Sequence, residues 1–145
     1  MCSDQEPRPT PPNGLAAALR VTAERLARGA SYQWGHFGAC NCGHLAQTLT
    51  SAPREAIHRA ALVRARDWGD AAVEYCPGSG LPLDHIIAQM LRAGLSLDDL
   101  RALEELSHAR VVRSFLARHQ RHPRRNDRAD VVAYMRLWAE ELESA

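Results

Sequence analysis

The sequence has no long apolar run and little net charge, and each absence excludes a class of function. No apolar stretch approaches the roughly 20 residues that span a bilayer, so we expect no membrane-spanning helix. The formal net charge is only +1, so bulk electrostatics do not recruit nucleic acid or anionic membranes. The first six residues lack a basic segment and an apolar run. We therefore expect no secretory signal and a cytoplasmic protein.

Cysteine is present only four times, and its use follows from the expected compartment. Cytoplasmic cysteines are normally reduced, so we expect thiols or metal ligands rather than a disulfide framework. A chain of 145 residues is long enough to bury a core as one domain, and it needs neither disulfides nor a metal merely to fold.

Helical periodicity runs through the chain, and no segment shows the apolar and polar alternation of a half-buried strand. Residues 1–12 are polar and contain four prolines, so we expect a disordered tail there. Residues 13–145 are predicted to form a single helical domain, in which apolar stripes at helical spacing are separated by short turns. The fold class predicted is all-α, a compact multi-helix bundle with short connections.

Capping and breaking residues predict several helix boundaries. Asn41 is the expected N-cap of the second helix. Ser96 is followed three residues later by Asp99, a weaker version of the capping box. Pro53 is expected to open a helix that continues until Gly69 breaks or kinks it.

Residues 32–47 concentrate the side chains that carry chemistry. These sixteen residues contain two thiols, two imidazoles, three aromatic rings and three glycines. Thiols and imidazoles bind soft or borderline metals, and they also act as nucleophiles and bases. His44 lies roughly 200° around a helix from Cys42, so these two side chains should point apart. His36, Cys40 and Cys42 can converge, because the first two precede the helix.

The leading prediction is a site for one transition metal ion, Zn²⁺ or iron. Cys76, in a loop rich in proline and glycine, offers a further thiol. The predicted ligands are Cys40, Cys42, Cys76 and either His36 or His44. Four protein ligands would make a closed structural site, whereas three would leave a position for water, and the sequence does not choose between them.

A second interpretation is a hydrolase or acyl-transfer enzyme with Cys42 as nucleophile. If Asn41 caps the helix, Cys42 is its first residue, and the positive end of the helix dipole favours the thiolate. His85, near the start of a later helix, is a candidate base. Free cysteines also commonly fill apolar cores, so inert packing is a further interpretation of these thiols.

The same segment resembles the nucleophile region of the NlpC-type cell-wall cysteine peptidases. The resemblance covers residues 15–50 and rests on two stretches, Tyr32-x-Trp34-Gly35 and Cys42-x-x-Leu45-x-Gln47. It implies Cys42 as the nucleophile and Tyr32 as a helper near the oxyanion. Members of that family carry their catalytic histidine on a β-strand in the second half. The chain also resembles an uncharacterised bacterial helical family through W-G…C-N-C-G-H-L and Y-C-P-x-S-G stretches, which imply no activity.

A partner-binding bundle without catalytic activity is the third class of function. Residues 118–125 form a basic run that is typical of a solvated loop. Such a run also fits contact with an acidic or phosphate-bearing partner. No aromatic residue interleaves it, so stacking on nucleic-acid bases is not expected.

Overall fold

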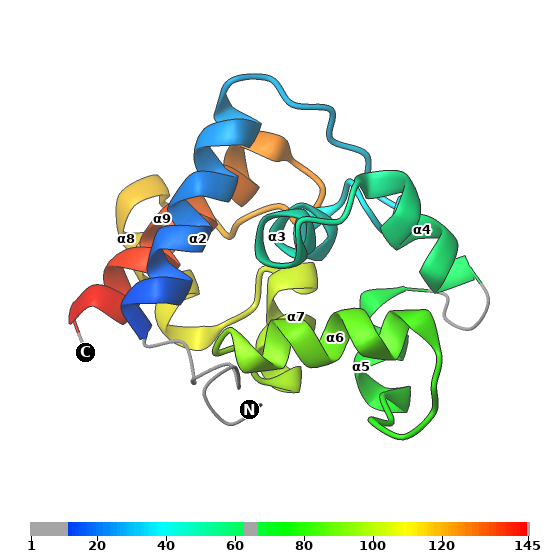
Figure 1. The fold of residues 1–145 in the computed structure, drawn as a ribbon. Helices are drawn as coiled ribbons and strands as arrows, with labels where there is room; N and C mark the ends of the chain where they lie inside the picture. Colours follow the sequence, from blue (N-terminus) through cyan, green and yellow to red (C-terminus); the bar gives the residue numbers. More distant parts are fainter. Residues whose placement is uncertain (1–11, 63–66, 145) are drawn as a thin grey trace.

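A computed structural model describes residues 12–62 and 67–144 of the chain. It confirms the all-α prediction, because the described residues form helices joined by turns and contain no strand (Figure 1). The helices are α2 (Pro12–Ala27), α3 (Asn41–Thr50), α4 (Arg54–Leu62), α5 (Trp68–Glu74), α6 (Pro82–Arg92), α7 (Leu97–Glu105), α8 (Ala109–His119) and α9 (Arg128–Ser144). No described helix is both long enough and apolar enough to cross a membrane. The predicted tail lies outside the described residues, except for Pro12, which already belongs to α2.

Helices α2 and α9 pack along each other, and α8 lies against α9 (Figure 1). Arg20 pairs with Glu143, and Glu24 pairs with Arg136, so α2 and α9 run in opposite directions. These exposed ion pairs set the register but contribute little stability. The stability of this pair comes from buried apolar side chains such as Leu19, which is completely buried.

Helix α3 lies at the centre of the fold, in contact with α2, α4, α6 and α7 (Figure 1). Its first six residues, 41–46, are all buried. A helix of ten residues is marginal in water, so tertiary packing must hold it in place. Gly43 lets α3 pack closely against the preceding loop, because a Cβ atom there would overlap the carbonyl oxygen of Phe37.

Two predicted boundaries are wrong. The N-cap of α3 is Cys40, and Asn41 is already helical. Asn41 is completely buried, and its amide reaches other parts of the chain instead of capping its own helix.

The second difference concerns Gly69, which lies inside α5 and does not break a helix. Helix α5 begins at Trp68, and the Asp67 carboxylate caps it by accepting a hydrogen bond from Asp70 N–H. The predicted capping box of α7 is confirmed, since the Ser96 and Asp99 side chains each accept a bond from the other's backbone N–H.

Candidate functional site

The start of α3 is held by the buried amide of Asn41. Its Nδ2 donates to the carbonyl oxygens of Leu103 and Glu104, both at 3.1 Å, and to that of Arg125 at 3.0 Å. Its Oδ1 accepts a hydrogen bond of 2.6 Å from the Tyr32 hydroxyl. The amide therefore joins α3 to the end of α7 and to the loop before α9. Tyr32, predicted as a helper near an oxyanion, contacts Asn41, and burial raises its pKa.

Two thiols and one carboxyl group meet where α3 begins. Oε1 of Glu104 lies 3.6 Å from Cys40 Sγ and 3.5 Å from the backbone nitrogen of Cys42. Cys42 Sγ donates a hydrogen bond of 3.1 Å to the carbonyl oxygen of Leu100. The exposed fractions are 2% for Cys40, 0% for Cys42 and 6% for Glu104. These three residues form the thiol–carboxyl cluster, which lies almost entirely out of contact with water.

Sequence reasoning missed Glu104, although its spacing held a signal. Glu104 follows Leu97 by seven residues and Leu100 by four, which places all three on one face of α7. Leu100 is completely buried and Leu97 is partly buried, so this spacing places Glu104 on the face of α7 that packs against the core. What the spacing could not show is that the stripe faces the cysteines of α3.

Burial dominates the ionisation of the thiol–carboxyl cluster. It raises the pKa of the Cys40 and Cys42 thiols well above the usual value. It also raises the pKa of Glu104 to about 7, while hydrogen bonds from the thiols and from the Cys42 N–H act in the opposite direction. At Cys42, burial therefore outweighs the effect that we expected from the helix terminus. The N–H groups of Gly43 and Cys42 do favour a thiolate at Cys40, but burial outweighs them.

A cavity of about 20 Å³ adjoins the cluster. It is lined by Gly35, Phe37, Cys40, Asp67, Trp68 and Glu104. This volume holds about one water molecule. Gly35 and Asp67 are exposed, so the cavity lies close to the surface, whereas Cys40 and Glu104 form its buried side.

His36 belongs to the loop before α3 but turns toward α4. Its ring stacks on His58, with centroids 4.0 Å apart and planes 17° from parallel. Nδ1 of His36 accepts a hydrogen bond from Gly38 N–H at 3.0 Å, and Nδ1 of His58 accepts one from Phe37 N–H at 3.1 Å. A neutral imidazole that accepts at Nδ1 carries its proton on Nε2. His36 thus has no free lone pair while it holds this loop.

His44 has both ring nitrogens engaged on the other side of α3. Nε2 lies 2.7 Å from the carbonyl oxygen of Ser31, and Nδ1 lies 3.4 Å from the guanidinium of Arg25 on α2. Burial lowers its pKa, so the neutral ring donates to Ser31 and accepts from Arg25. His44 and Cys42 contact different elements, α2 and α7, as their spacing predicted.

Cys76 and His85 lie away from the thiol–carboxyl cluster, one in the loop before α6 and the other on α6. Cys76 is exposed in the loop between α5 and α6, and His85 is exposed on α6 itself. Neither residue lines the cavity beside Cys40. Across residues 12–62 and 67–144, no three His, Cys, Asp or Glu side chains form a ready-made metal site.

The basic run is tied to acidic residues of the same chain. Arg121 makes a bidentate ion pair with the buried Asp130, at 2.7 and 2.9 Å. Arg125 pairs with Glu105 at 2.6 Å and lies over the ring of Trp34. These two arginines therefore have partners within the protein.

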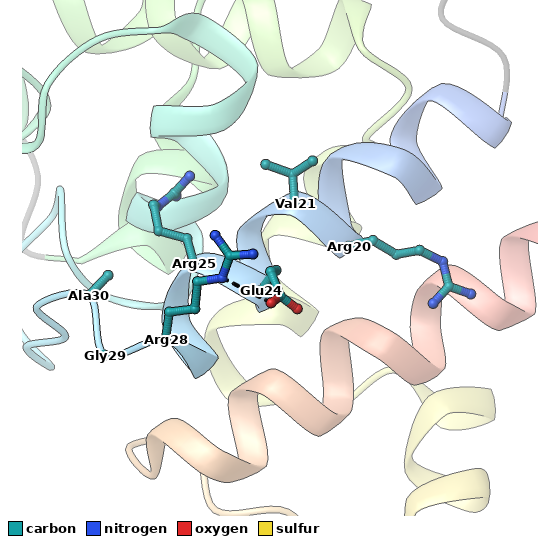
Figure 2. A pocket seen from close by; sticks show the side chains of 7 residues that line it. All are labelled: Arg20, Val21, Glu24, Arg25, Arg28, Gly29 and Ala30. Atoms are coloured by element: carbon teal, nitrogen blue, oxygen red, sulfur yellow. Dashed lines mark hydrogen bonds and ion pairs between the residues drawn. The ribbon is translucent and has the colours of Figure 1, made fainter.

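An open hollow of about 770 Å³ lies over the outer face of α2 (Figure 2). Arg28 pairs there with Glu24, and Arg20 extends toward α9, where it pairs with Glu143. Arg25 reaches α3, where it donates to the His44 carbonyl oxygen at 2.8 Å. All three arginines thus bind within the chain, which leaves the hollow without an unpaired guanidinium.

Comparison of the chain with protein-family models, with curated proteins and with solved structures finds no match. The similarity to NlpC-type peptidases therefore rests on residues 15–50 alone. The described residues contain no strand of the kind on which those enzymes carry their catalytic histidine.

Proposed function

We propose that the protein binds one transition metal ion, Zn²⁺ or iron, through Cys40, Cys42 and Glu104. The observation that carries the proposal is the Glu104 carboxyl group, which faces two thiols in the core. Among the described residues, no cationic side chain pairs with it. Buried charges in proteins are paired or coordinate metals. A bound divalent cation would offset two of the three negative charges of the carboxylate and both thiolates, which lose their protons when the metal binds.

The spacing within the cluster fits shared coordination. Sulfur and oxygen ligands bind zinc at about 2.3 and 2.1 Å, so on a tetrahedral ion they lie about 3.6 Å apart. The distance from Cys40 Sγ to Glu104 Oε1 is 3.6 Å. Cys42 must leave its hydrogen bond to Leu100 to become the third ligand, which agrees with the lack of a ready-made site among the described residues.

The proposed ligand set revises the one predicted from the sequence. Cys40 and Cys42 remain, and Glu104 takes the place of the histidines and of Cys76. A cytoplasmic location is part of the proposal, because it keeps thiols reduced and able to bind metal. The described cysteines are all free thiols in the structure.

Elemental analysis of protein purified without a histidine tag tests the metal proposal. We expect close to one zinc or iron per chain in the unaltered protein. Cys40→Ser, Cys42→Ser and Glu104→Gln should each reduce the metal content several-fold, because each removes a ligand. Cys76→Ser is the matched control and should leave it unchanged. Metal content near zero, or equal loss in the control, would refute the proposal.

A second candidate function is thiol chemistry at Cys40 rather than at Cys42. Cys40 lines the small cavity and lies beside the N–H groups at the start of α3. The Glu104 carboxyl group, 3.6 Å from Cys40 Sγ, would accept the thiol proton. Alkylation by iodoacetamide separates the two functions, with the exposed Cys76 as internal reference. A nucleophilic Cys40 would react with or without a chelator and more slowly after Glu104→Gln. A metal-bound Cys40 would react only after chelation.

A further inference from the structure

A second cavity, of about 560 Å³, lies between α6 and the loop that precedes it. It is lined by Tyr75, Pro77, Gly80, Leu81, Pro82, Asp84, His85, Ala88 and Arg92. On α6 the lining positions 85, 88 and 92 follow the spacing of one helix face. The opposite face of α6 is fixed in the core through Leu83, Ile87 and Met90, all completely buried. One wall of this groove is therefore a helix that cannot move independently.

The facing wall is a loop held by its own hydrogen bonds. The Asp84 carboxylate accepts from the Cys76 N–H at 3.3 Å and from the Ser79 hydroxyl. Ser79 Oγ in turn accepts from Leu81 N–H at 3.0 Å. Pro77 and Pro82 fix further backbone torsions. The groove is thus preformed, and its volume falls in the range of small-molecule sites.

Two basic side chains line this groove, and neither pairs with another residue in the described part of the chain. No described residue makes a hydrogen bond or an ion pair with the His85 ring or with the Arg92 guanidinium. By contrast, Arg20, Arg121 and Arg125 all pair with carboxylates. Among the described residues, the groove therefore offers a guanidinium without an ion-pair partner, next to an aromatic ring and apolar side chains. The Asp84 carboxylate also lines it, but hydrogen bonds hold that group to the loop.

We propose that this groove binds a small organic anion, one that joins a phosphate or carboxylate to an aromatic ring. The Arg92 guanidinium binds the anionic group, since its planar fork matches both phosphate and carboxylate. The ring of Tyr75 and the side chains of Leu81 and Ala88 contact the apolar part. His85 adds a second donor about 10 Å along the helix from Arg92.

Titration of ¹⁵N-labelled protein, followed by NMR chemical shifts, tests this inference. The probes are phenyl phosphate, benzoate and the neutral benzyl alcohol, so that the two anion types and the aromatic ring are compared separately. We expect saturable shifts confined to residues 75–92 for at least one of the anions. Arg92→Ala should raise the Kd of that anion about tenfold, whereas the Kd of benzyl alcohol should change less than about twofold.

The control is Arg113→Ala, which removes an exposed arginine of α8 and should leave anion binding unchanged. Because Arg92 is exposed, its variant should fold, and Arg92→Gln provides a second variant that keeps a polar side chain. Shifts spread over the whole surface, equal weakening by Arg92→Ala and Arg113→Ala, or no saturable shift with either anion would overturn the inference. The groove shares no residue with the thiol–carboxyl cluster, so the result is independent of metal binding.

Discussion

Asp130 shows how a single buried carboxylate organises the loop that leads into α9. It is 4% exposed and accepts two hydrogen bonds from the Arg121 guanidinium and one from the Arg124 N–H. The bonds from Arg121 lower the pKa of Asp130, so the folded protein favours the charged carboxylate. The basic run therefore stabilises the fold, whatever else it contacts.

Asp130→Asn should lower the free energy of unfolding by about 2 kcal/mol at pH 7, because it removes charge-assisted hydrogen bonds. The pKa of Asp130 is lowered in the folded state, so this stability is present above the ordinary aspartate pKa of about 3.9. It is lost as the pH falls below that value toward the folded pKa. Urea denaturation gives the free energy of unfolding of the variant and of the parent at pH 7 and pH 3. The difference between the two proteins should be smaller at pH 3. A difference in the free energy of unfolding that does not change with pH would contradict this account. Asp98→Asn, at an exposed position, is the control and should show no such difference.

Gly43 limits how closely α3 can approach the loop before it. A Cβ atom at this position would overlap the Phe37 carbonyl oxygen, which also accepts a hydrogen bond of 3.1 Å from Trp68 Nε1. Three elements meet at this oxygen: the loop, α3 and α5. The loop cannot shift for an added methyl group without weakening the bond to Trp68.

Gly43→Ala should therefore destabilise the protein by about 1–3 kcal/mol, the usual cost of overpacking a core. Gly78→Ala is a matched control, because a Cβ atom there meets nothing within 4 Å. Guanidinium denaturation of both variants gives the two free energies of unfolding. Similar values for Gly43→Ala and the parent would show that the loop moves freely.

At the level of helices, the sequence predicted what depends on local patterns. The Ser96 capping box and the all-α class follow from spacing within a few residues. The N-cap at Cys40 was missed because asparagine is a common N-cap residue, which favoured Asn41. In the structure the Asn41 amide instead donates hydrogen bonds to carbonyl oxygens of α7 and of Arg125. The pairing of Glu104 with Cys40 joins residues 64 positions apart, and periodicity gives no information on which faces meet.

The whole molecule is stabilised chiefly by its buried apolar side chains. Leu19 lies on α2, the helix that packs against α9, and its exposed fraction is 0%. Val21, two residues further along the same helix, is 54% exposed. Leu19→Ala should cost about 2–5 kcal/mol, since it leaves a cavity between helices. Val21→Ala should change stability by less than about 0.5 kcal/mol. Thermal unfolding followed by circular dichroism compares the two, and equal shifts in Tm would contradict the assigned interface.

The contact between α2 and α9 joins the first and last described helices of the chain, which are synthesised at different times. Residues 28–127 separate the two helices along the chain, so α2 leaves the ribosome long before its partner exists. At translation rates of about 5–20 residues per second, its apolar face stays uncovered for several seconds. Binding of a chaperone to the nascent chain in that interval would protect it. We expect α9 to dock last among the described helices, because it is made after all of them and packs against α2.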